Sequence, residues 1–232
     1  MRSRSLVSVS QLIGAAALLA SPALAQSYTL VDLGTLYGES HAFALANALA
    51  SGVLVAGSST DAASNFQAML CDPAPSGVPR VAGLRQAVAF DVLNDGRTVG
   101  AAYNLGSMSW HAFVRDGSSL VDLGAFAARG VNSAGDIAGT TTVVTSTFGG
   151  LTLPRACRWH AGVLQTLPTL GGQSSLAMAI DEAGRVGGSS FNAGDVASRP
   201  CLWVGSTAID LGTLGGTMGQ VYAVRGDHAV GV

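Results

Sequence analysis

Four five-residue segments recur every 44 residues: Gln67–Cys71 (QAMLC), His111–Arg115 (HAFVR), Arg155–Trp159 (RACRW) and Arg199–Trp203 (RPCLW). They align without a gap, because they begin at positions 67, 111, 155 and 199. Self-similarity at a fixed period of about 20–50 residues is the signature of repeat proteins, which stack one supersecondary unit several times. The spacing therefore predicts a repeat protein.

Two further landmarks follow the same period. An Asp-Leu-Gly phrase appears in Val121–Gly124 and Ile209–Gly212, and Gln165–Pro168 occupies the place between them; the same phrase opens the domain as Val31–Leu36. A turn followed by a short apolar strand that ends in glycine appears in Gly52–Gly57, Gly96–Gly100, Gly135–Gly139, Gly184–Gly188 and, in part, Asp227–Gly231. Asn or Asp shortly before Gly suits the positive φ angles of tight hairpins.

Each period contains four short segments with strand character. In the fourth unit they are Leu176–Ile180, Arg185–Ser190, Pro200–Val204 and Thr207–Leu211. Gly, Ser, Asn and Asp separate them, as expected between strands. Four strands in about 44 residues is the layout of a β-propeller blade. We therefore predict an all-β, β-propeller-like array over residues 26–232, with units at about 31–81, 82–121, 122–167 and 168–209 and a partial unit at 210–232.

The first 25 residues have the features of a signal peptide. Arg2 and Arg4 supply a positive start, Leu12–Ala20 is an apolar run shorter than a membrane span, and Pro22–Ala25 provides small residues for cleavage. A membrane anchor would need a longer apolar stretch. The sequence therefore predicts secretion, to the periplasm, the cell surface or the medium, with no membrane insertion after cleavage.

Three phrases resemble the bacterial extracellular HAF-repeat family: Trp110–Phe113 (WHAF), Val121–Gly124 (VDLG) and Ile209–Gly216 (IDLGTLGG). The family is named for its His-Ala-Phe tripeptide, and the resemblance covers essentially the whole chain after residue 25. It implies a bacterial extracellular repeat protein and no particular activity. The chain departs from the pattern because only one copy keeps His-Ala-Phe in the expected strand; His41–Phe43 reads instead as first-strand sequence.

Charge and cysteine content exclude several classes of function. A formal net charge of −2 offers no electrostatic footprint for nucleic acid. Cys71, Cys157 and Cys201 are three widely spaced thiols, which is neither a disulfide framework nor a zinc pattern. Since Cys157 and Cys201 are repeat-equivalent, we expect buried core thiols rather than a bridge.

The histidines and aspartates give no catalytic constellation. The four histidines are His41, His111, His160 and His228, and none of them forms a His-x-x-x-His pair. Gln67, Arg155 and Arg199 replace His111 in sister copies, which favours a polar strand-edge role. The repeated aspartates Asp32, Asp122 and Asp210 are expected to accept backbone hydrogen bonds at strand ends.

Two other motifs have ordinary interpretations. The adhesion-like tripeptide Arg225–Asp227 lies where the hairpin turn of the fifth unit is expected. Trp110, Trp159 and Trp203 have the chemistry to stack on sugars, but Trp159 and Trp203 are repeat-equivalent and are expected in the core. We predict no catalytic, metal or cofactor-binding residue.

The sequence favours a secreted non-catalytic binding or scaffold module whose partner is an extracellular protein or a glycan. An extracellular glycosidase or lyase with acidic residues in a propeller channel is the alternative, and a truncated family member without its own activity is another. The fifth unit ends within its second strand. We therefore expect either a truncated array or one completed by another chain, and Tyr28–Leu33 is a candidate strand for its last sheet.

Overall fold

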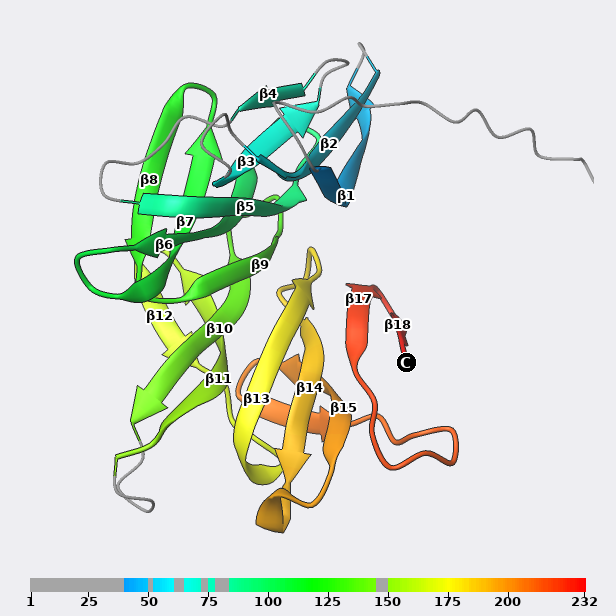
Figure 1. Cartoon of the computed structure of the whole chain (residues 1–232). Coiled ribbons are helices and arrows are strands. Elements are labelled where there is room, and N and C mark those ends of the chain that lie inside the picture. The colour runs from blue at the N-terminus through cyan, green and yellow to red at the C-terminus, as the bar shows by residue number, and fades with distance from the viewer. Residues whose placement is uncertain (1–39, 50–51, 61–64, 72–74, 78–83, 145–149) are drawn as a thin grey trace, which may run out of the picture. The chain divides into compact units, whose positions relative to one another are not determined.

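Antiparallel strands account for nearly all of the regular structure. The computed structural model describes residues 40–49, 52–60, 65–71, 75–77, 84–144 and 150–232, which belong to the compact unit Leu33–Val232. Strands that follow one another in the chain pair into several small antiparallel sheets (Figure 1). The prediction of an all-β protein is confirmed.

Four of the sheets have four strands. The first contains β1 (Ser40–Leu49), β2 (Gly52–Thr60), β3 (Phe66–Cys71) and β4 (Pro75–Gly77). The second contains β5 (Leu84–Val92), β6 (Thr98–Asn104), β7 (Ser109–Asp116) and β8 (Ser119–Gly124). The third contains β9 (Ala127–Val131), β10 (Ile137–Val144), β11 (Thr152–His160) and β12 (Val163–Thr166). The fourth contains β13 (Gly171–Ile180), β14 (Val186–Asn192), β15 (Ser198–Val204) and β16 (Thr207–Asp210).

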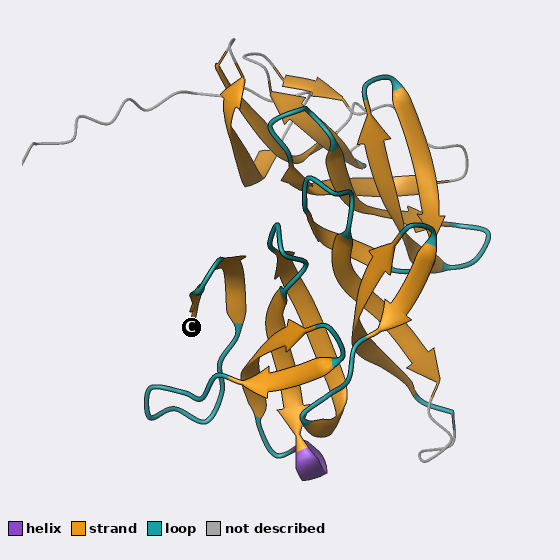
Figure 2. Cartoon of the chain, turned by 180° about the vertical axis from the view of Figure 1, so that it is seen from behind, coloured by secondary structure: helices purple, strands orange, loops and turns teal. Residues whose placement is uncertain are grey.

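The fifth sheet has two described strands, β17 (Val221–Arg225) and β18 (His228–Gly231). They form a hairpin whose register pairs Arg225 with His228, so the adhesion-like tripeptide lies at its turn. The candidate strand Tyr28–Leu33 lies outside the described residues. A 3-10 turn, η2 (Ala193–Asp195), drawn in purple, joins β14 to β15 (Figure 2). In the described part of the chain, no helix is long and apolar enough to cross a membrane.

The sequence landmarks fall at equivalent places in successive sheets. The four 44-residue repeats lie in the third strands β3, β7, β11 and β15. The Gly-containing turns connect first strands to second strands, and Gly96, Gly135 and Gly184 there have φ angles of +88°, +86° and +77°. His41–Phe43 lies in the first strand β1, as expected.

The sheet boundaries differ slightly from the predicted unit boundaries. Val121–Gly124 belongs to the end of β8 rather than to the start of a third unit, because Asp122 pairs in register with Phe113 of β7. The first strand of the fourth sheet, β13, begins at Gly171 rather than Leu176, since Gly171 already pairs with Asn192. The Asp-Leu-Gly phrase therefore closes a sheet.

A β-bulge interrupts the first strand of every sheet at the same place. The register between the first and second strands shifts by one residue there, which leaves one first-strand residue without a cross-strand partner. These residues, here called the bulge residues, are Phe43, Phe90, Arg129, Met178 and Tyr222. A bulge of this kind bends the strand and re-aims a side chain.

The glycine that ends each second-strand motif is required by the bulge. At Gly100, Gly139, Gly188 and Gly231, an added Cβ would overlap a backbone carbonyl oxygen within or next to the first strand, that of Val88, Ala127, Leu176 and Gln220 respectively. Only glycine lets two backbones approach so closely. The repeated glycine is therefore a packing requirement of the bulge.

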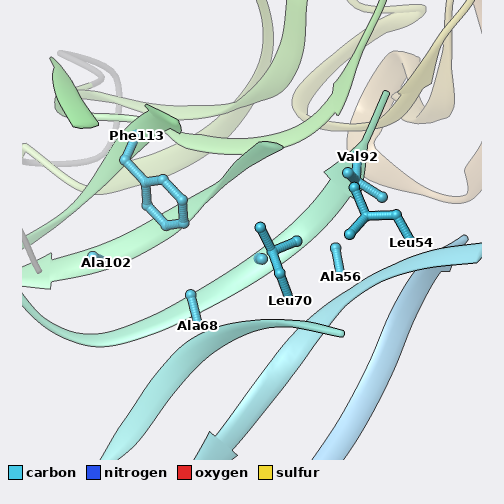
Figure 3. Close-up of a cluster of buried hydrophobic side chains, with 8 residues drawn as sticks. Leu54, Ala56, Ala68, Leu70, Val92, Ala102 and Phe113 are labelled. Atoms are coloured by element: carbon cyan, nitrogen blue, oxygen red, sulfur yellow. The ribbon is translucent and has the colours of Figure 1, made fainter. Parts of the chain in front are cut away.

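Neighbouring sheets share hydrophobic cores. The first core joins Leu54, Ala56, Ala68 and Leu70 of the first sheet to Ala89, Val92, Ala102 and Phe113 of the second (Figure 3). Two further cores join the second sheet to the third and the third to the fourth in the same way. Each core combines small Ala side chains with larger ones, which allows close packing between the sheets.

We predict that Gly188→Ala destabilises the protein by about 1–3 kcal/mol or more, because its methyl group overlaps the Leu176 carbonyl oxygen. Gly216→Ala is the matched control, since the nearest atom to its Cβ would be the Met218 oxygen at 3.8 Å. Urea unfolding followed by circular dichroism measures both variants. Equal stability of the two variants would contradict the role assigned to the bulge glycine.

Candidate functional site

The repeated histidine and arginine positions contact the repeated aspartates. His111 Nδ1 lies 2.9 Å from Asp122 Oδ2, and Arg199 Nε lies 3.1 Å from Asp210 Oδ2. The other oxygen of each aspartate accepts a backbone N–H two residues on, from Gly124 or Gly212, at 2.8 Å. The prediction that the repeated aspartates accept backbone hydrogen bonds is confirmed for these two. The pairs tie the third strand to the fourth, which is a structural role.

The third sheet lacks this pair. Thr166 stands where the second and fourth sheets have Asp122 and Asp210, and Pro168, which has no N–H, stands where they have glycine. Arg155 instead contacts the Gln173 carbonyl at 3.4 Å, and its Nε is buried with no hydrogen-bond partner among the described residues. The third sheet therefore differs from its neighbours in both the aspartate and its backbone donor, and a buried guanidinium N–H is left unsatisfied.

Two of the cysteines and two of the tryptophans belong to the core. Cys157 and Cys201 are free and buried, and burial raises the pKa of both thiols to about 12. The prediction of buried core thiols is confirmed for these two. Trp203 is 1% exposed and donates from Nε1 to the Pro168 carbonyl at 2.7 Å, and Trp159 packs against the core between the second and third sheets.

The other titratable residues singled out from the sequence are Asp32, His41, Cys71 and His228. Asp32 precedes the described residues, and the side chains of His41 and Cys71 also lie outside the described part of the structure. His228 is exposed at the start of β18.

His160 belongs to a polar cluster at a hairpin turn. Its Nδ1 contacts Asp136 Oδ1, and Arg158 Nη2 lies 2.5 Å from Asp136 Oδ2. Burial opposes the ionisation of Asp136, but the hydrogen bonds from His160, Arg158 and Asn132 outweigh it and hold its pKa below the ordinary range. The cluster keeps Asp136 charged and shields it, so it stabilises the turn.

Polar contacts link the hairpin turns of successive sheets. Arg97 donates to the Ser133 carbonyl at 2.7 Å, and Asn132 donates to the Asp181 carbonyl at 3.1 Å. Arg185 then reaches Asp227 at 3.4 Å. These contacts give the polar turn residues a structural role, so their presence does not call for a catalytic role.

The third tryptophan lines an open hollow, here called the aromatic cleft. Its volume is about 440 Å³, and its lining includes residues of β6, β7, β9, β10, β11 and β13. Trp110 is 43% exposed and meets Tyr103 edge to face, with ring centroids 5.7 Å apart and planes at 74°. The two residues are directly opposite each other in the β6–β7 register. Cross-strand pairing therefore fixes the orientation of the exposed indole.

Hydroxyl groups add a polar lining to the aromatic pair. Thr140, Thr141 and Thr142 are successive residues of β10, and Thr152 and Ser109 complete the polar lining. The Thr141 hydroxyl already has a partner, since it donates to the Ala125 carbonyl at 3.0 Å. Arg129 is the only charged side chain among the described residues that line the cleft. The cleft thus combines an aromatic wall, hydroxyls and one cation.

A second hollow, here called the inner cavity, has a volume of about 550 Å³ and is lined by first strands of four sheets. Four bulge residues line it: Phe90, Arg129, Met178 and Tyr222. The bulges therefore bring equivalent residues of different sheets to one space.

Asp91 of β5 also lines the inner cavity. Its two oxygens accept backbone N–H groups, from Val92 and from Val131 of the next sheet, each at 2.9 Å. Burial raises the pKa of Asp91 to about 6, against those two hydrogen bonds. A carboxyl with such a pKa suits proton transfer. Glycoside hydrolysis uses two carboxylates, and Asp91 is the one acid among the described residues lining this cavity.

Asp91, Arg129 and Tyr103 were not predicted from the sequence. For Asp91 and Arg129 the available signal was departure from the repeat, because each places a charged residue where the equivalent residues of the other first strands are uncharged. No group of three His, Cys, Asp or Glu side chains that could hold a metal ion occurs among the described residues.

We predict that Thr166→Asp raises the free energy of unfolding by about 0.5–1 kcal/mol, because it supplies Arg155 with the carboxylate that Arg199 has in Asp210. Pro168 cannot add the backbone hydrogen bond, so the gain comes from the ion pair alone. The measurement is urea unfolding of Thr166→Asp with and without Arg155→Met. An equal gain in the Arg155→Met background would show that no pair forms.

We predict that Asp91 makes the protein less stable as pH rises. Its pKa is about 6 when folded and has an ordinary value of 3.8, so the folded state binds more protons between about pH 4 and pH 6. The contribution of Asp91 to the free energy of unfolding is fully present below about pH 4. It is lost as pH rises through 6, and the loss is about 2–3 kcal/mol. In Asp91→Asn that contribution disappears. The measurement is the free energy of unfolding of wild type and Asp91→Asn at several pH values. If the difference in unfolding free energy between the two proteins stays constant with pH, the prediction is refuted.

Comparison with known proteins finds no protein-family model that matches the sequence and no curated protein that matches it.

Proposed function

We propose that this chain is a secreted, non-catalytic binding module that holds a saccharide in the aromatic cleft. The observation that carries the proposal is Trp110, a large aromatic side chain that stays 43% exposed inside a hollow. Its repeat equivalents are Phe66, Pro154 and Ser198, so the fold does not require an indole there. A residue that departs from the repeat at an exposed position is a candidate for function.

The chemistry of the cleft suits a sugar. The apolar face of a pyranose ring packs on an aromatic side chain, and its hydroxyls need hydrogen-bond partners at the edges. Trp110 and Tyr103 offer the aromatic surface, and Thr140, Thr142 and Thr152 offer hydroxyls. A protein partner would call for a flatter and larger apolar surface. We therefore favour the glycan.

We further propose that the four-stranded sheets are blades of a β-propeller-like array, and that the chain is a member of the extracellular HAF-repeat family. Face-to-face packing of successive four-stranded sheets supports the blade interpretation. The signal-peptide features of residues 1–25 support secretion. Sugars are abundant at the cell exterior, which agrees with the cleft chemistry.

One observation favours an enzyme as the second candidate. Asp91 carries a raised pKa of about 6 in the inner cavity. A lyase needs a general base, so one carboxyl is sufficient for proton abstraction. Release of unsaturated sugars from an acidic polysaccharide, lost in Asp91→Asn, would establish this alternative.

We predict that Trp110→Ala weakens saccharide binding by about tenfold or more, because truncation removes the main contact surface. Tyr222→Ala is the matched control, since Tyr222 is an exposed aromatic residue that lies outside the aromatic cleft. Isothermal titration of the purified protein with a panel of neutral and acidic oligosaccharides measures the affinities. Absence of binding to every oligosaccharide, or equal loss in both variants, would contradict the proposal.

A further inference from the structure

Arg129 is a cation without an acidic partner in the described part of the chain. Its guanidinium carbon lies over the Phe90 ring, 4.0 Å from the ring centroid. Among the described residues, no carboxylate oxygen lies within 4.0 Å of it and no oxygen accepts a hydrogen bond from it. Burial lowers the pKa of Arg129, which reflects the cost of holding this charge away from water. Arg129 is partly buried. Charged side chains that are removed from water are ordinarily paired, so a partly buried guanidinium with no acidic partner calls for an explanation.

The repeat shows that the fold does not need arginine there. Arg129 is the bulge residue of the third sheet, and its equivalents are Phe43, Phe90, Met178 and Tyr222. All four equivalents are apolar or aromatic residues. Arginine in this series places a charge where the other sheets have apolar groups, and it gains no ion pair with any described residue in return.

The surroundings of Arg129 leave it available to a ligand. Arg129 lines both the aromatic cleft and the inner cavity. The fully buried side-chain nitrogens that lack a hydrogen-bond partner belong to other arginines of the described chain. Asp91 lines the inner cavity as well, but it forms no ion pair with Arg129, and its two oxygens accept the backbone N–H groups of Val92 and Val131. Phe90 holds the guanidinium by a cation–π contact, which uses the face of the guanidinium and not its N–H donors.

We infer that the ligand of the aromatic cleft is a carboxylate-bearing saccharide whose carboxylate binds the Arg129 guanidinium. The inference rests on the proposed function, because it names the class of sugar held by that same cleft. Arginine presents a planar fork of donors that matches a carboxylate in a bidentate arrangement. As the one charged group among the described lining residues, it would select acidic over neutral sugars. Arg129 is thus a specificity-determining residue.

The test compares ligands that differ in charge. The probes are oligosaccharides of galacturonic, glucuronic and mannuronic acid, each with its neutral methyl ester, and a sulfated oligosaccharide distinguishes carboxylate recognition from general anion binding. The proteins are the wild type, Arg129→Met, Arg129→Lys and Arg225→Met. Methionine keeps an unbranched apolar stem against Phe90, lysine keeps the charge, and Arg225 is an exposed arginine outside the cleft.

We predict that at least one uronate oligosaccharide binds the wild type about tenfold to a hundredfold more tightly than its methyl ester. Arg129→Met should abolish that difference while leaving the affinity for the ester unchanged. Arg129→Lys should restore part of it, and Arg225→Met should keep all of it. Thermal melts of each variant verify that it is folded.

The outcomes separate this inference from the proposed function. If acids and esters bind equally and Trp110→Ala abolishes both, the cleft binds sugars but the role of Arg129 is refuted. If the sulfated oligosaccharide binds as tightly as the uronates, recognition of carboxylate is refuted. If no saccharide binds at all, the proposed function fails and the inference fails with it.

Discussion

The close approach of a glycine to a first-strand carbonyl is the constraint on which the rest of the structure depends. At Gly100, Gly139, Gly188 and Gly231 a side chain would overlap a carbonyl oxygen within or next to that strand. The approach accommodates one extra residue in the first strand, and the same bulge recurs in every sheet. Because a bulge bends the strand and turns one side chain, this single device sets both the shape of each sheet and the direction of its bulge residue.

The residues assigned to function are those that differ from their equivalents in the other repeats. The cores use repeat-equivalent residues such as Cys157 and Cys201, and the polar contacts His111–Asp122 and Arg199–Asp210 use others. Trp110 and Arg129 match none of their equivalents in residue type, and both line the aromatic cleft. In a repeat protein, equivalent positions in different copies show which residue types the fold accepts at that position. The unmatched residues are therefore the ones whose presence the fold alone does not explain.

Much of the fold could be predicted from the sequence, and little of the site. The 44-residue spacing predicted third strands, and the Asn or Asp before Gly predicted the hairpin turns, because both depend on local chemistry. The bulges could not be predicted, because a bulge is defined by the pairing of one strand with its partner, and the sequence of a single strand does not give that register. Without the bulges, Phe90, Arg129, Met178 and Tyr222 could not be placed in one cavity. Asp91 was missed for a related reason, because its environment comes in part from a neighbouring sheet through the Val131 N–H.

A crystal structure of the protein with a bound uronate oligosaccharide would test the assignment of the aromatic cleft most directly. We expect a sugar ring packed against the Trp110 indole, with its carboxylate on the Arg129 guanidinium. A sugar bound in the inner cavity beside Asp91, with the aromatic cleft empty, would contradict this assignment and would favour the enzyme. In that case the bulges would serve to assemble a reaction site rather than to select a ligand.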